Sequence, residues 1–488
     1  MSRLKTERVY RKFTGISALT LAVTIGVLAA SMSERAFAGV QDGKQQESGW
    51  AQVPQILKRI VPPTFPDRDF VITDYGAVPG GKDLCTDAFR KAIEACSKAG
   101  GGRVVVPKGV FLTGAIHLVS NVNLHVSKGA ILKFSTDPKD YLPLVFTRYE
   151  GIECMNFSPL IYAYGQRNVA LTGEGTLDGQ ANDQYWWPWA GKKQFGWKPG
   201  EPSMRDPGNR PALAKMNDEK VPVEKRIFGP GHYLRPTFVE FYDCRNVLMQ
   251  GVTLENAPFW FLHPTMCTNV TVDGIKTNSN GPNTDGCDPE SCDDVVVENC
   301  VFNDGDDCIA IKSGRNNDGR RINVPAQNTV VRDCTMKNGH GGVSIGSEVS
   351  GGARNIFIEN CKLSSPDLDQ GLRIKSNAKR GGVVENIYAR NLAIGQVKVA
   401  IVRIDLNYDP AETEGYDFYP TVKNIFVQDV TSQKSEYGLY LTGLPQSKIR
   451  AVSIRDCKFN GVAKGNNITD AVGLKLGNVF VNGSLVKE

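Results

Sequence analysis

A repeat of short apolar strands constrains the fold of this chain more than any other feature of its sequence. In each copy, a strand rich in Val and Ile is followed by Asn, Asp or Gly, then by an apolar residue or Cys, and then by another short strand. The apolar residue or Cys of the eight clearest copies stands at positions 252, 275, 300, 334, 361, 392, 430 and 457. Successive positions are 23 to 38 residues apart. Periods in this range, with almost no helical patterns between the strands, indicate a solenoid.

The repeat predicts an all-β fold, a single-stranded right-handed parallel β-helix whose coils pair with one another at a spacing of roughly 4.8 Å. Asn and Asp before the apolar position suit a bend, because both tolerate left-handed backbone geometry. The cysteines at 300, 334, 361 and 457 share that position with Val, Ile and Leu, so we expect buried, unreactive thiols. A β-propeller would need blades of roughly 40–50 residues with a recurring motif, which the sequence lacks.

The first 38 residues predict a cleaved signal peptide. They combine a basic start, an uncharged apolar run over residues 16–30 and the small-x-small sequence Ala36-Phe37-Ala38. The apolar run is short for the alternative, a membrane anchor. Residues 1–38 contain six Lys or Arg and two Glu, so the formal charge of +5 falls to about +1 without them. Any attraction for an acidic polymer must therefore be local rather than a property of the whole chain.

The rest of the chain divides into a short lead-in and one long domain. Residues 39–66 are polar and include the prolines at 62, 63 and 66, so we expect a linker or a loosely packed lead-in. Residues 67–488 are expected to form the β-helix. Helical spacing over 87–99 predicts a short helix that caps its amino-terminal end, where an open coil edge would invite aggregation.

All twelve cysteines follow residue 38, and export would permit disulfides. Cys85 and Cys96 flank the predicted helix and are a candidate pair. A second pair could form among the four cysteines between 287 and 308. A zinc site in that cluster is disfavoured, because its spacing does not resemble two Cys-x₂-Cys pairs.

Four short strings with chemically active side chains recur in phase with the repeat. They are Asn283-Thr284-Asp285-Gly286, Gly305-Asp306-Asp307, Gly339-His340-Gly341-Gly342 and Arg373-Ile374-Lys375. Their key residues follow the apolar position of the coil by six to fourteen residues. Four consecutive coils therefore deliver polar side chains just past the same strand. Alone, each string would be a turn or a solvated face. Together, they predict carboxylates, an imidazole and two cations on one face, which is typical of acid/base chemistry.

The four strings resemble, in order, the signatures of the polygalacturonase family, glycoside hydrolase family 28. Asp288 and the run from Gly342 to Ser347 extend the match, and the resemblance covers roughly residues 67–488. It implies an enzyme that hydrolyses α-1,4-galacturonosidic bonds in polygalacturonate or pectin by an inverting acid/base mechanism. It implies no cofactor and no metal. It also implies a parallel β-helix, in agreement with the repeat.

The resemblance implies catalytic roles for four side chains. Asp306 is expected to be the general acid, with a proton held on it by repulsion within the carboxylate cluster. Asp285 and Asp307 are expected to activate the attacking water. His340 is expected to tune the acid through a hydrogen bond to the carboxylates.

Substrate-binding roles are expected for a second group of residues. Arg373 and Lys375 are expected to bind a substrate carboxylate, because an Arg fork suits a planar carboxylate and Lys adds a point charge. Asn283 is expected to contact substrate or to orient the neighbouring carboxylate. Tyr408 and Tyr416 are further candidates for contacts with sugar.

Residues 180–237 interrupt the repeat and bear on the mode of attack. They contain Tyr185-Trp186-Trp187-Pro188-Trp189, Trp197 and many basic residues. Such an excursion could wall off one end of the groove or stack sugar rings, as in bacterial family members that cut from chain ends. It could instead be a packing lid with no substrate role. We favour exo-action over endo-action on this basis. His263 is interpreted as structural.

Three other functions compete with this interpretation. The first is a pectate lyase on the same fold, which would need Ca²⁺. The second is a β-helical adhesin or carbohydrate-binding solenoid. The third is a family relative acting on rhamnogalacturonan or xylogalacturonan, which Arg373-Ile374-Lys375 disfavours. The expected partner is pectic polysaccharide or oligogalacturonide, with no nucleic acid, and no membrane after signal cleavage. We expect a monomer, secreted or periplasmic, in a bacterium.

Overall fold

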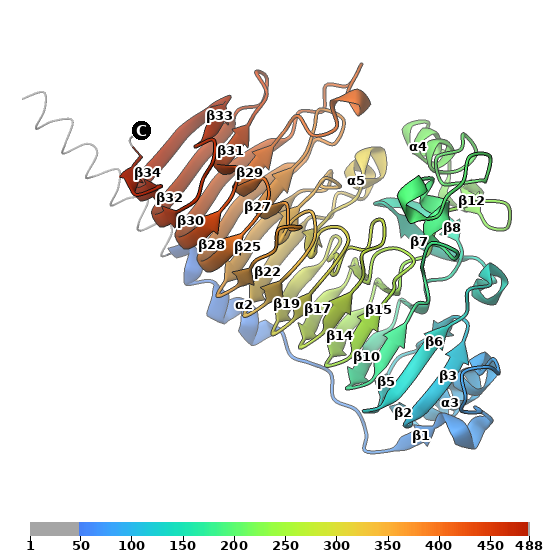
Figure 1. Ribbon diagram of the computed structural model, residues 1–488. Coiled ribbons are helices and arrows are strands. Elements are labelled where there is room, and N and C mark those ends of the chain that lie inside the picture. Colours follow the sequence, from blue (N-terminus) through green and yellow to red (C-terminus); the bar gives the residue numbers. More distant parts are fainter. Residues whose placement is uncertain (1–47, 487–488) are drawn as a thin grey trace, which may run out of the picture. The chain divides into compact units, whose positions relative to one another are not determined.

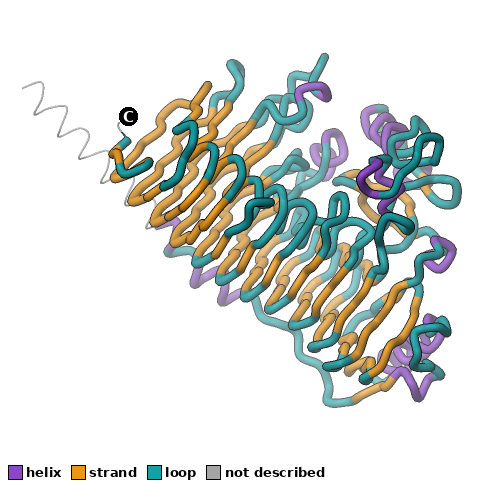
Figure 2. The backbone as a smooth tube through the Cα atoms, viewed as in Figure 1, coloured by secondary structure: helices purple, strands orange, loops and turns teal. Residues whose placement is uncertain are grey.

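The computed structural model describes residues 48–486, so the predicted signal peptide lies outside the described residues. The chain divides into two compact units, residues 1–52 and 53–488, and the second contains the whole β-helix. Parallel strands stack coil upon coil in this unit (Figures 1 and 2). It is the right-handed parallel β-helix that the repeat predicted. Within residues 48–486, no helix combines the length and apolar character needed to cross a membrane.

The larger sheet has 22 strands, and all its pairings are parallel except a terminal hairpin. Its strands are β1 (Asp69–Val71), β2 (Gly102–Val106), β3 (Gly109–Thr113), β5 (Val122–Val126), β6 (Ala130–Phe134), β10 (Arg167–Gly173), β11 (Thr176–Asp178), β14 (Arg245–Gln250), β15 (Thr253–Glu255), β17 (Thr268–Asp273), β18 (Lys276–Asn278), β19 (Asp293–Glu298), β20 (Val301–Phe302), β22 (Ala326–Arg332), β23 (Thr335–Met336), β25 (Ala353–Glu359), β26 (Lys362–Leu363), β28 (Val383–Gln396), β30 (Thr421–Lys434), β32 (Ile449–Phe459), β34 (Ala471–Val481) and β35 (Ser484–Leu485).

A second parallel sheet carries the polar strings. Its strands are β4 (Ile116–His117), β9 (Ile161–Tyr164), β13 (Val239–Tyr242), β16 (Leu262–Thr265), β21 (Ile309–Ile311), β24 (Val343–Ile345), β27 (Gln370–Lys375), β29 (Ala400–Asp405), β31 (Tyr437–Thr442) and β33 (Asn467–Thr469). Between β16 and β21, single parallel bridges at Cys287 and Glu290 take the place of a strand. The row of coils is therefore unbroken at the carboxylate strings.

Strand register confirms the repeat. Val247 pairs with Val270, which pairs with Val295, and the same position continues through Ile356 and Ile387. The residues before the apolar position adopt the left-handed conformation that their type predicts, with φ between 52° and 58° at 299, 333, 360, 391, 429 and 456. Equivalent residues of successive coils thus stand above one another.

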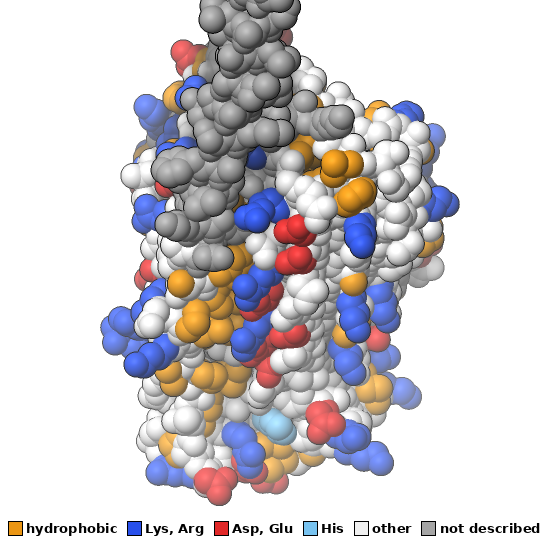
Figure 3. Space-filling model, turned by 90° about the vertical axis from the view of Figure 1, so that its left-hand side faces the viewer, with side chains coloured by type: hydrophobic (Ala, Val, Ile, Leu, Met, Phe, Trp, Pro, Cys, Tyr) orange, Lys and Arg blue, Asp and Glu red, His pale blue; other side chains and the backbone are white. Residues whose placement is uncertain are grey.

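The same stacking orders the charged surface. Glu298, Arg332, Glu359 and Arg390 occupy equivalent positions on four successive coils. Ion pairs of 2.5 Å join Arg332 to Glu298 and Arg390 to Glu359. Figure 3 shows charged side chains of both signs gathered in a column on one face of the molecule.

All twelve cysteines are free and buried, so the suggested disulfides were wrong. Cys85 is the residue before α3 (Thr86–Lys98) and Cys96 lies near its end. Eleven residues of helix separate them by roughly 16 Å along the axis, which is far beyond the reach of a disulfide. Cys300, Cys334 and Cys361 lie in the apolar core, as their shared position in the repeat predicted.

Short helices cover the ends and edges of the solenoid. They are α2 (Val53–Arg59), α3 (Thr86–Lys98), α4 (Arg210–Asp218), α5 (Asn316–Ile322), and the 3₁₀ turns η1 (Ile72–Tyr75), η2 (Pro138–Tyr141), η3 (Trp187–Ala190), η4 (Lys193–Phe195), η5 (Val223–Lys225) and η6 (Pro410–Glu412). The predicted capping helix is α3, whose Phe89, Ala92 and Ile93 are buried in the core. The described part of the lead-in, residues 48–66, is more ordered than expected, because α2 forms within it and Arg59 Nε donates to Asp294 at 2.8 Å.

Three insertions leave the repeat beside the second sheet. The first is built from two excursions of the chain, the hairpin of β7 (Val145–Tyr149) and β8 (Ile152–Asn156) and a later segment with α4 and β12 (Ile227–Phe228), and β12 pairs with β8. The second holds α5, and the third is the loop over 406–420, which includes η6. Figure 1 shows α4, β12, β8 and β7 grouped together, apart from the strands of the larger sheet. These insertions supply side chains to the site.

Candidate active site

Neighbouring strands of the second sheet position the predicted residues. Asp285 precedes the bridge at Cys287, Asp306 and Asp307 precede β21, and His340 precedes β24. Arg373 lies on β27, in register with Ser344 of β24. The strings therefore meet at one place because their strands are consecutive and parallel.

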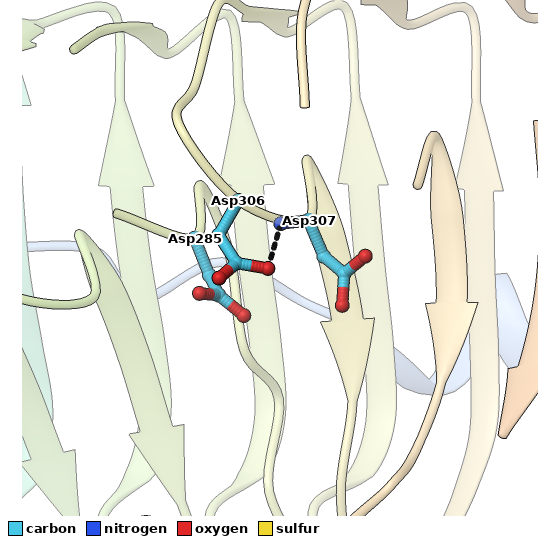
Figure 4. A group of neighbouring side chains, drawn as sticks. All are labelled: Asp285, Asp306 and Asp307. Atoms are coloured by element: carbon cyan, nitrogen blue, oxygen red, sulfur yellow. Dashed lines mark hydrogen bonds between the residues drawn. The ribbon is translucent and has the colours of Figure 1, made fainter. Parts of the chain in front are cut away.

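The three carboxylates form a tight cluster. Oxygens of Asp285, Asp306 and Asp307 lie within 4.8 Å of one another. The Asp307 backbone N–H donates to Asp306 Oδ1 at 3.0 Å (Figure 4). In Figure 4 the carboxylates of Asp285 and Asp306 lie close together, and that of Asp307 lies to one side of them. Because Asp285 and Asp307 are buried, repulsion within the cluster is poorly screened.

Asp307 is held as an anion by cations of β27, two coils further along the sheet. It accepts hydrogen bonds from Lys375 Nζ at 2.7 Å, from Arg373 at 3.1 Å and from Ser344 Oγ at 2.8 Å. Although burial opposes it, Lys375 and Arg373 hold the pKa of Asp307 well below its usual range. Both predicted substrate-binding cations thus already neutralise a carboxylate. The Tyr408 ring lies 5.6 Å from the Arg373 guanidinium and 5.4 Å from Lys375 Nζ.

Asp306 pairs with His340. His340 Nδ1 lies 2.9 Å from Asp306 Oδ1. The Asp306 carboxylate raises the pKa of His340 to about 9. Burial favours the neutral acid, but the imidazolium outweighs it and lowers the pKa of Asp306. The expectation that repulsion alone keeps a proton on Asp306 was therefore wrong, because His340 touches this carboxylate.

Repulsion within the cluster acts instead on Asp285. Burial, followed by the nearby Asp306 carboxylate, raises the pKa of Asp285 to about 8. The nearest cation to Asp285 is Lys312, with Nζ 3.5 Å from Oδ2. We did not predict Lys312 from the sequence. It follows Ile311 as Lys375 follows Ile374, and the two isoleucines hold the same register position, so the phase of the repeat could have identified it.

The cluster opens into a cavity of about 250 Å³. Basic side chains from outside the repeat line it, namely Lys192, Arg210, Arg315 and Arg380, together with Lys312 and Lys375. Asp285, Asp306 and His340 also line the cavity, whereas Asp307 and Arg373 do not. Four further acids, Glu150, Glu348, Asp409 and Glu412, share this lining, so the cavity is dense in charges of both signs.

A network of ion pairs, here called the closing network, joins the three insertions around this cavity. Arg315 precedes α5 and contacts Glu150, in the turn between β7 and β8, at 2.5 Å. The Nη2 atom of Arg315 contacts Glu412 of η6 at 2.7 Å. Arg380 also contacts Glu412 at 2.7 Å, and Arg210 of α4 contacts Glu150 at 2.7 Å. None of these residues was predicted, because they lie on segments without a repeat.

A second groove, of about 600 Å³, lies on the other side of His340. Its wall includes a ladder of amides in which Asn303 donates to Asn278 at 2.7 Å and Asn338 donates to Asn303 at 2.6 Å. His340 lines both spaces. Asp306 and its partner therefore stand at the boundary between a cationic cavity and an amide-lined groove.

Of the other residues considered from the sequence, two line the cavity and two do not. Asn283 lines the cavity, and its Oδ1 accepts a hydrogen bond from buried Arg235 at 2.8 Å. Tyr408 also lines the cavity. Tyr416 does not: its hydroxyl donates to Asp218 of α4 at 3.1 Å, which ties the 406–420 loop to the first insertion. His263 is fully buried between two glutamates, in keeping with a structural role.

The aromatic excursion packs into the protein rather than presenting rings to the cavity. Trp186 and Trp187 are buried. Trp187 donates from Nε1 to the Ala257 carbonyl at 3.0 Å, and Trp186 packs edge-on against Tyr141. The same segment nevertheless places Lys192 on the cavity wall. Its contribution to the cavity is a charge and not a stacking platform.

The carboxylate cluster has the oxygen donors that a divalent cation prefers. Each carboxylate, however, already contacts a protein cation: Lys312 at Asp285, His340 at Asp306, and Arg373 with Lys375 at Asp307. A metal ion here would face these positive groups at close range. The donor set therefore fits an acid/base site better than a metal site.

Buried carboxylates, a paired imidazole and a cation-lined cavity on a parallel β-helix define a class, the β-helical enzymes that cleave acidic polysaccharides. The model of the glycosyl hydrolases family 28 matches residues 230–475. The chain belongs to this family of glycoside hydrolases.

Individual relatives agree with this assignment. The chain is 28% identical over 424 residues to a probable polygalacturonase of Vitis vinifera, covering 83% of this chain and 78% of the relative. It is 29% identical over 413 residues to an exo-poly-alpha-D-galacturonosidase of Dickeya chrysanthemi, covering 76% and 64%. The crystal structure of a hyperthermoactive exopolygalacturonase from Thermotoga maritima superposes with a TM-score of 0.86 at 44% identity, covering 89% of this chain and 96% of that one.

Proposed function

We propose that this protein hydrolyses α-1,4-galacturonosidic bonds in polygalacturonate or pectin, and that it acts from a chain end. The observation that carries the proposal is the cluster of Asp285 and Asp306 inside a cavity lined by six Lys and Arg side chains. A galacturonate unit has one carboxylate, for which Lys or Arg side chains of the cavity wall are suitable partners. Family membership and the names of the relatives support the same substrate.

We assign the catalytic roles on the resemblance and on these contacts. Asp306 donates a proton to the leaving oxygen, and Asp285, supported by Asp307 behind it, activates water. Because the Asp285 and Asp306 carboxylates interact strongly, their protons belong to the pair rather than to either residue. One proton shared by the two supplies both an acid and a base. His340, as an imidazolium, balances the negative charge that remains on the pair.

Inversion of configuration needs its own test. Inverting enzymes typically separate acid and base by roughly 6.5–9.5 Å, whereas the oxygens of this cluster lie within 4.8 Å. Inversion is proposed from the resemblance alone. Proton NMR of the first product formed from an oligogalacturonide would report its anomer. A β-anomer supports inversion, and an α-anomer contradicts it.

The three insertions support exo-action. Ion pairs join them around the cavity, whereas the groove on the other side of His340 is much larger. A chain end can occupy the cavity while the rest of the polymer lies in the groove. We propose that Lys375 and the cavity cations bind the carboxylate of the terminal unit, with Asn283 and Tyr408 beside it.

Chromatography of products against time, on polygalacturonate and on pectin, tests the function. Exo-action predicts short products from the first minutes with little loss of viscosity. Rapid viscosity loss with few short products would establish the endo alternative. Activity that needs Ca²⁺ and yields ultraviolet-absorbing unsaturated product would establish the lyase. Binding without reducing-sugar release would indicate a carbohydrate-binding solenoid, and cleavage of rhamnogalacturonan or xylogalacturonan alone would indicate the other relatives.

We further propose export, with cleavage of residues 1–38, and a monomeric enzyme whose catalytic domain spans 67–488. The composition of the amino terminus supports export. Amino-terminal sequencing of protein recovered from culture medium and from periplasm would test it. The expected first residue is Gly39, and protein retained in the membrane with its amino terminus intact would contradict the proposal.

A further inference from the structure

A buried lysine links the carboxylate pair to a second group of acids. Lys312 Nζ lies 3.5 Å from Asp285 Oδ2, 3.8 Å from Asp288 Oδ1 and 3.5 Å from Glu348 Oε2. Its side chain is 3% exposed. Within the described chain it is the only cation that forms an ion pair with Asp285. One ammonium therefore serves three acids, one of which lines the cavity beside Asp306.

We propose that Lys312 is a positioning residue that sets the pH range over which the Asp285–Asp306 pair holds a single proton. The inference deepens the proposed function and rests on it, because the pair is the proposed acid and base. Lys312 itself needs no contact with the reacting atoms. Its charge acts on the pair through Asp285.

The environment of Lys312 makes its charge effective. Its Nζ lies 4.4 Å from the centre of the Trp260 ring, and this aromatic face leaves no room for water on that side. At about 4 Å, two charges interact several times more strongly in a protein than in bulk water. An opposite charge at this distance lowers a carboxyl pKa by about one to three pH units.

The neighbouring charges leave Lys312 as the main counter-charge of Asp285. Glu348 is also approached by Arg315, at 3.8 Å. Asp307 is compensated by Arg373 and Lys375, and Asp306 by His340. Asp288 is fully buried, and its two oxygens lack hydrogen-bond partners in the described part of the chain. Burial, followed by Asp285, raises the pKa of Asp288 well above its usual range, and its 3.8 Å contact is the longest of the three that Lys312 makes with these acids.

Replacing Lys312 should move the whole pH profile. Loss of the positive charge favours the protonated form at both ionisations of the pair. In Lys312→Met, both limbs of the bell-shaped profile of kcat/KM are therefore expected to shift to higher pH, by about one unit or more. Lys312→Arg keeps the charge and is expected to hold the profile close to that of the wild type.

Glu348→Gln provides an independent test with the opposite sign. Contact with Lys312 and Arg315 overcomes burial and holds the pKa of Glu348 well below its usual range, so this residue is an anion. Removing its charge frees Lys312 to act on Asp285. Both limbs should then move to lower pH. This variant also tests the inference if Lys312→Met does not fold.

Lys379→Met is a matched control. Lys379 has the same kinds of contact as Lys312, a carboxylate (Asp218 at 2.9 Å) and an aromatic ring (Tyr416 at 4.3 Å), but it does not line the cavity. Its removal should leave both limbs where they are. The experiment measures kcat/KM for an oligogalacturonide from pH 3 to 10 in all variants, with circular dichroism to check folding.

Opposite shifts in Lys312→Met and Glu348→Gln, with none in Lys379→Met, would support the inference. Unmoved limbs in folded Lys312→Met, or in Glu348→Gln if the lysine variant does not fold, would overturn it. The proposed function fails separately, if wild-type protein releases no reducing sugar. Infrared titration of the carboxyl stretch that disappears in Asp285→Asn would then still show whether Lys312 lowers this ionisation.

Discussion

At the scale of single residues, neighbouring charges decide where protons lie in this site. Two adjacent carboxylates, Asp306 and Asp307, would be equivalent by their sequence context. In the structure one pairs with His340 and the other with Lys375 and Arg373. Asp285 is buried beside Asp306 and shares the ammonium of Lys312 with two other acids, and its pKa stays raised, at about 8. Partner contacts therefore give three chemically identical side chains different affinities for a proton.

The raised pKa predicts the alkaline limit of activity. Below about pH 8 the Asp285–Asp306 pair keeps one proton, and above it both carboxylates ionise. No proton is then available for the leaving oxygen. We expect kcat/KM to fall about tenfold per pH unit above this limit, measured by reducing-sugar release in buffers of constant ionic strength. An unchanged rate up to pH 10 would contradict the shared-proton assignment.

Asp306→Asn is expected to reduce kcat by about 10²–10⁴-fold, the usual contribution of general acid catalysis. The amide has nearly the same shape, so oligogalacturonide binding and thermal unfolding should change little. Asp333→Asn is a matched control, because Asp333 has φ of 55° at a bend where other coils use Asn. Full activity of Asp306→Asn would remove this residue from the mechanism.

At the scale of elements, the repeat and the insertions do different work. Parallel strands β21, β24 and β27 place the predicted strings side by side. The insertions then close the cavity through the contacts of Glu150, Arg315 and Glu412. Burial opposes its ionisation, but Arg315 and Arg380 lower the pKa of Glu412 to about 2, so the closing network stays charged at any pH where the enzyme would work.

Glu412→Gln is expected to loosen the 406–420 loop and to open the cavity. The neutral amide loses the charge that holds Arg315 and Arg380 at 2.7 Å. Products should then become longer on average, and viscosity should fall more for each reducing end released. Glu414→Gln is the matched control, since Glu414 is exposed on the same loop. An unchanged product distribution in Glu412→Gln would show that this network does not determine the mode of attack.

At the scale of the whole molecule, a buried polar network lies behind the site. His263 Nε2 contacts Glu290 at 2.9 Å and Nδ1 contacts Glu240 at 3.3 Å, and Arg148 contacts Glu290 at 2.8 Å. All four side chains are fully buried. Such a network stabilises the fold only while its charges are paired, because an unpaired buried charge is costly.

This network predicts how stability depends on pH. Burial lowers the pKa of His263, but Glu240 and Glu290 outweigh it and raise the pKa to about 9. The pKa of His263 in the folded protein exceeds its unfolded value near 6.5. The contribution of His263 to stability is therefore complete below about pH 6.5 and is lost as pH rises towards 9. Burial opposes the ionisation of Glu290, but Arg148 and His263 lower its pKa to about 2. The contribution of Glu290 to stability is therefore lost as pH falls from about 4.5 to 2.

We therefore expect the melting temperature to be highest between about pH 4.5 and 6.5, measured by calorimetry or circular dichroism. His263→Gln should lower the melting temperature and should make it fall less between pH 6.5 and 9. His232→Gln is the control, since this half-buried histidine is outside the network. If His263→Gln melts with the wild-type pH dependence, the imidazole does not ionise as inferred.

The sequence by itself determined the coil architecture and the row of predicted residues. In parallel stacking, residues of equal phase lie above one another, so position in the repeat predicts position in space. This is why the sequence alone predicts that the strings at Asp285, Asp306 and His340 lie close together. The left-handed bends and the buried cysteines follow from the same rule.

Only the tertiary structure decided the lining of the cavity and the partner of each carboxylate. Glu150, Arg315 and Glu412 belong to insertions without a repeat, so no phase relates them in the sequence. A pKa depends on burial and on contacts of a few ångströms, which spacing along the chain does not encode. The repeat therefore reveals which groups share a face, and folding determines how their charges are paired.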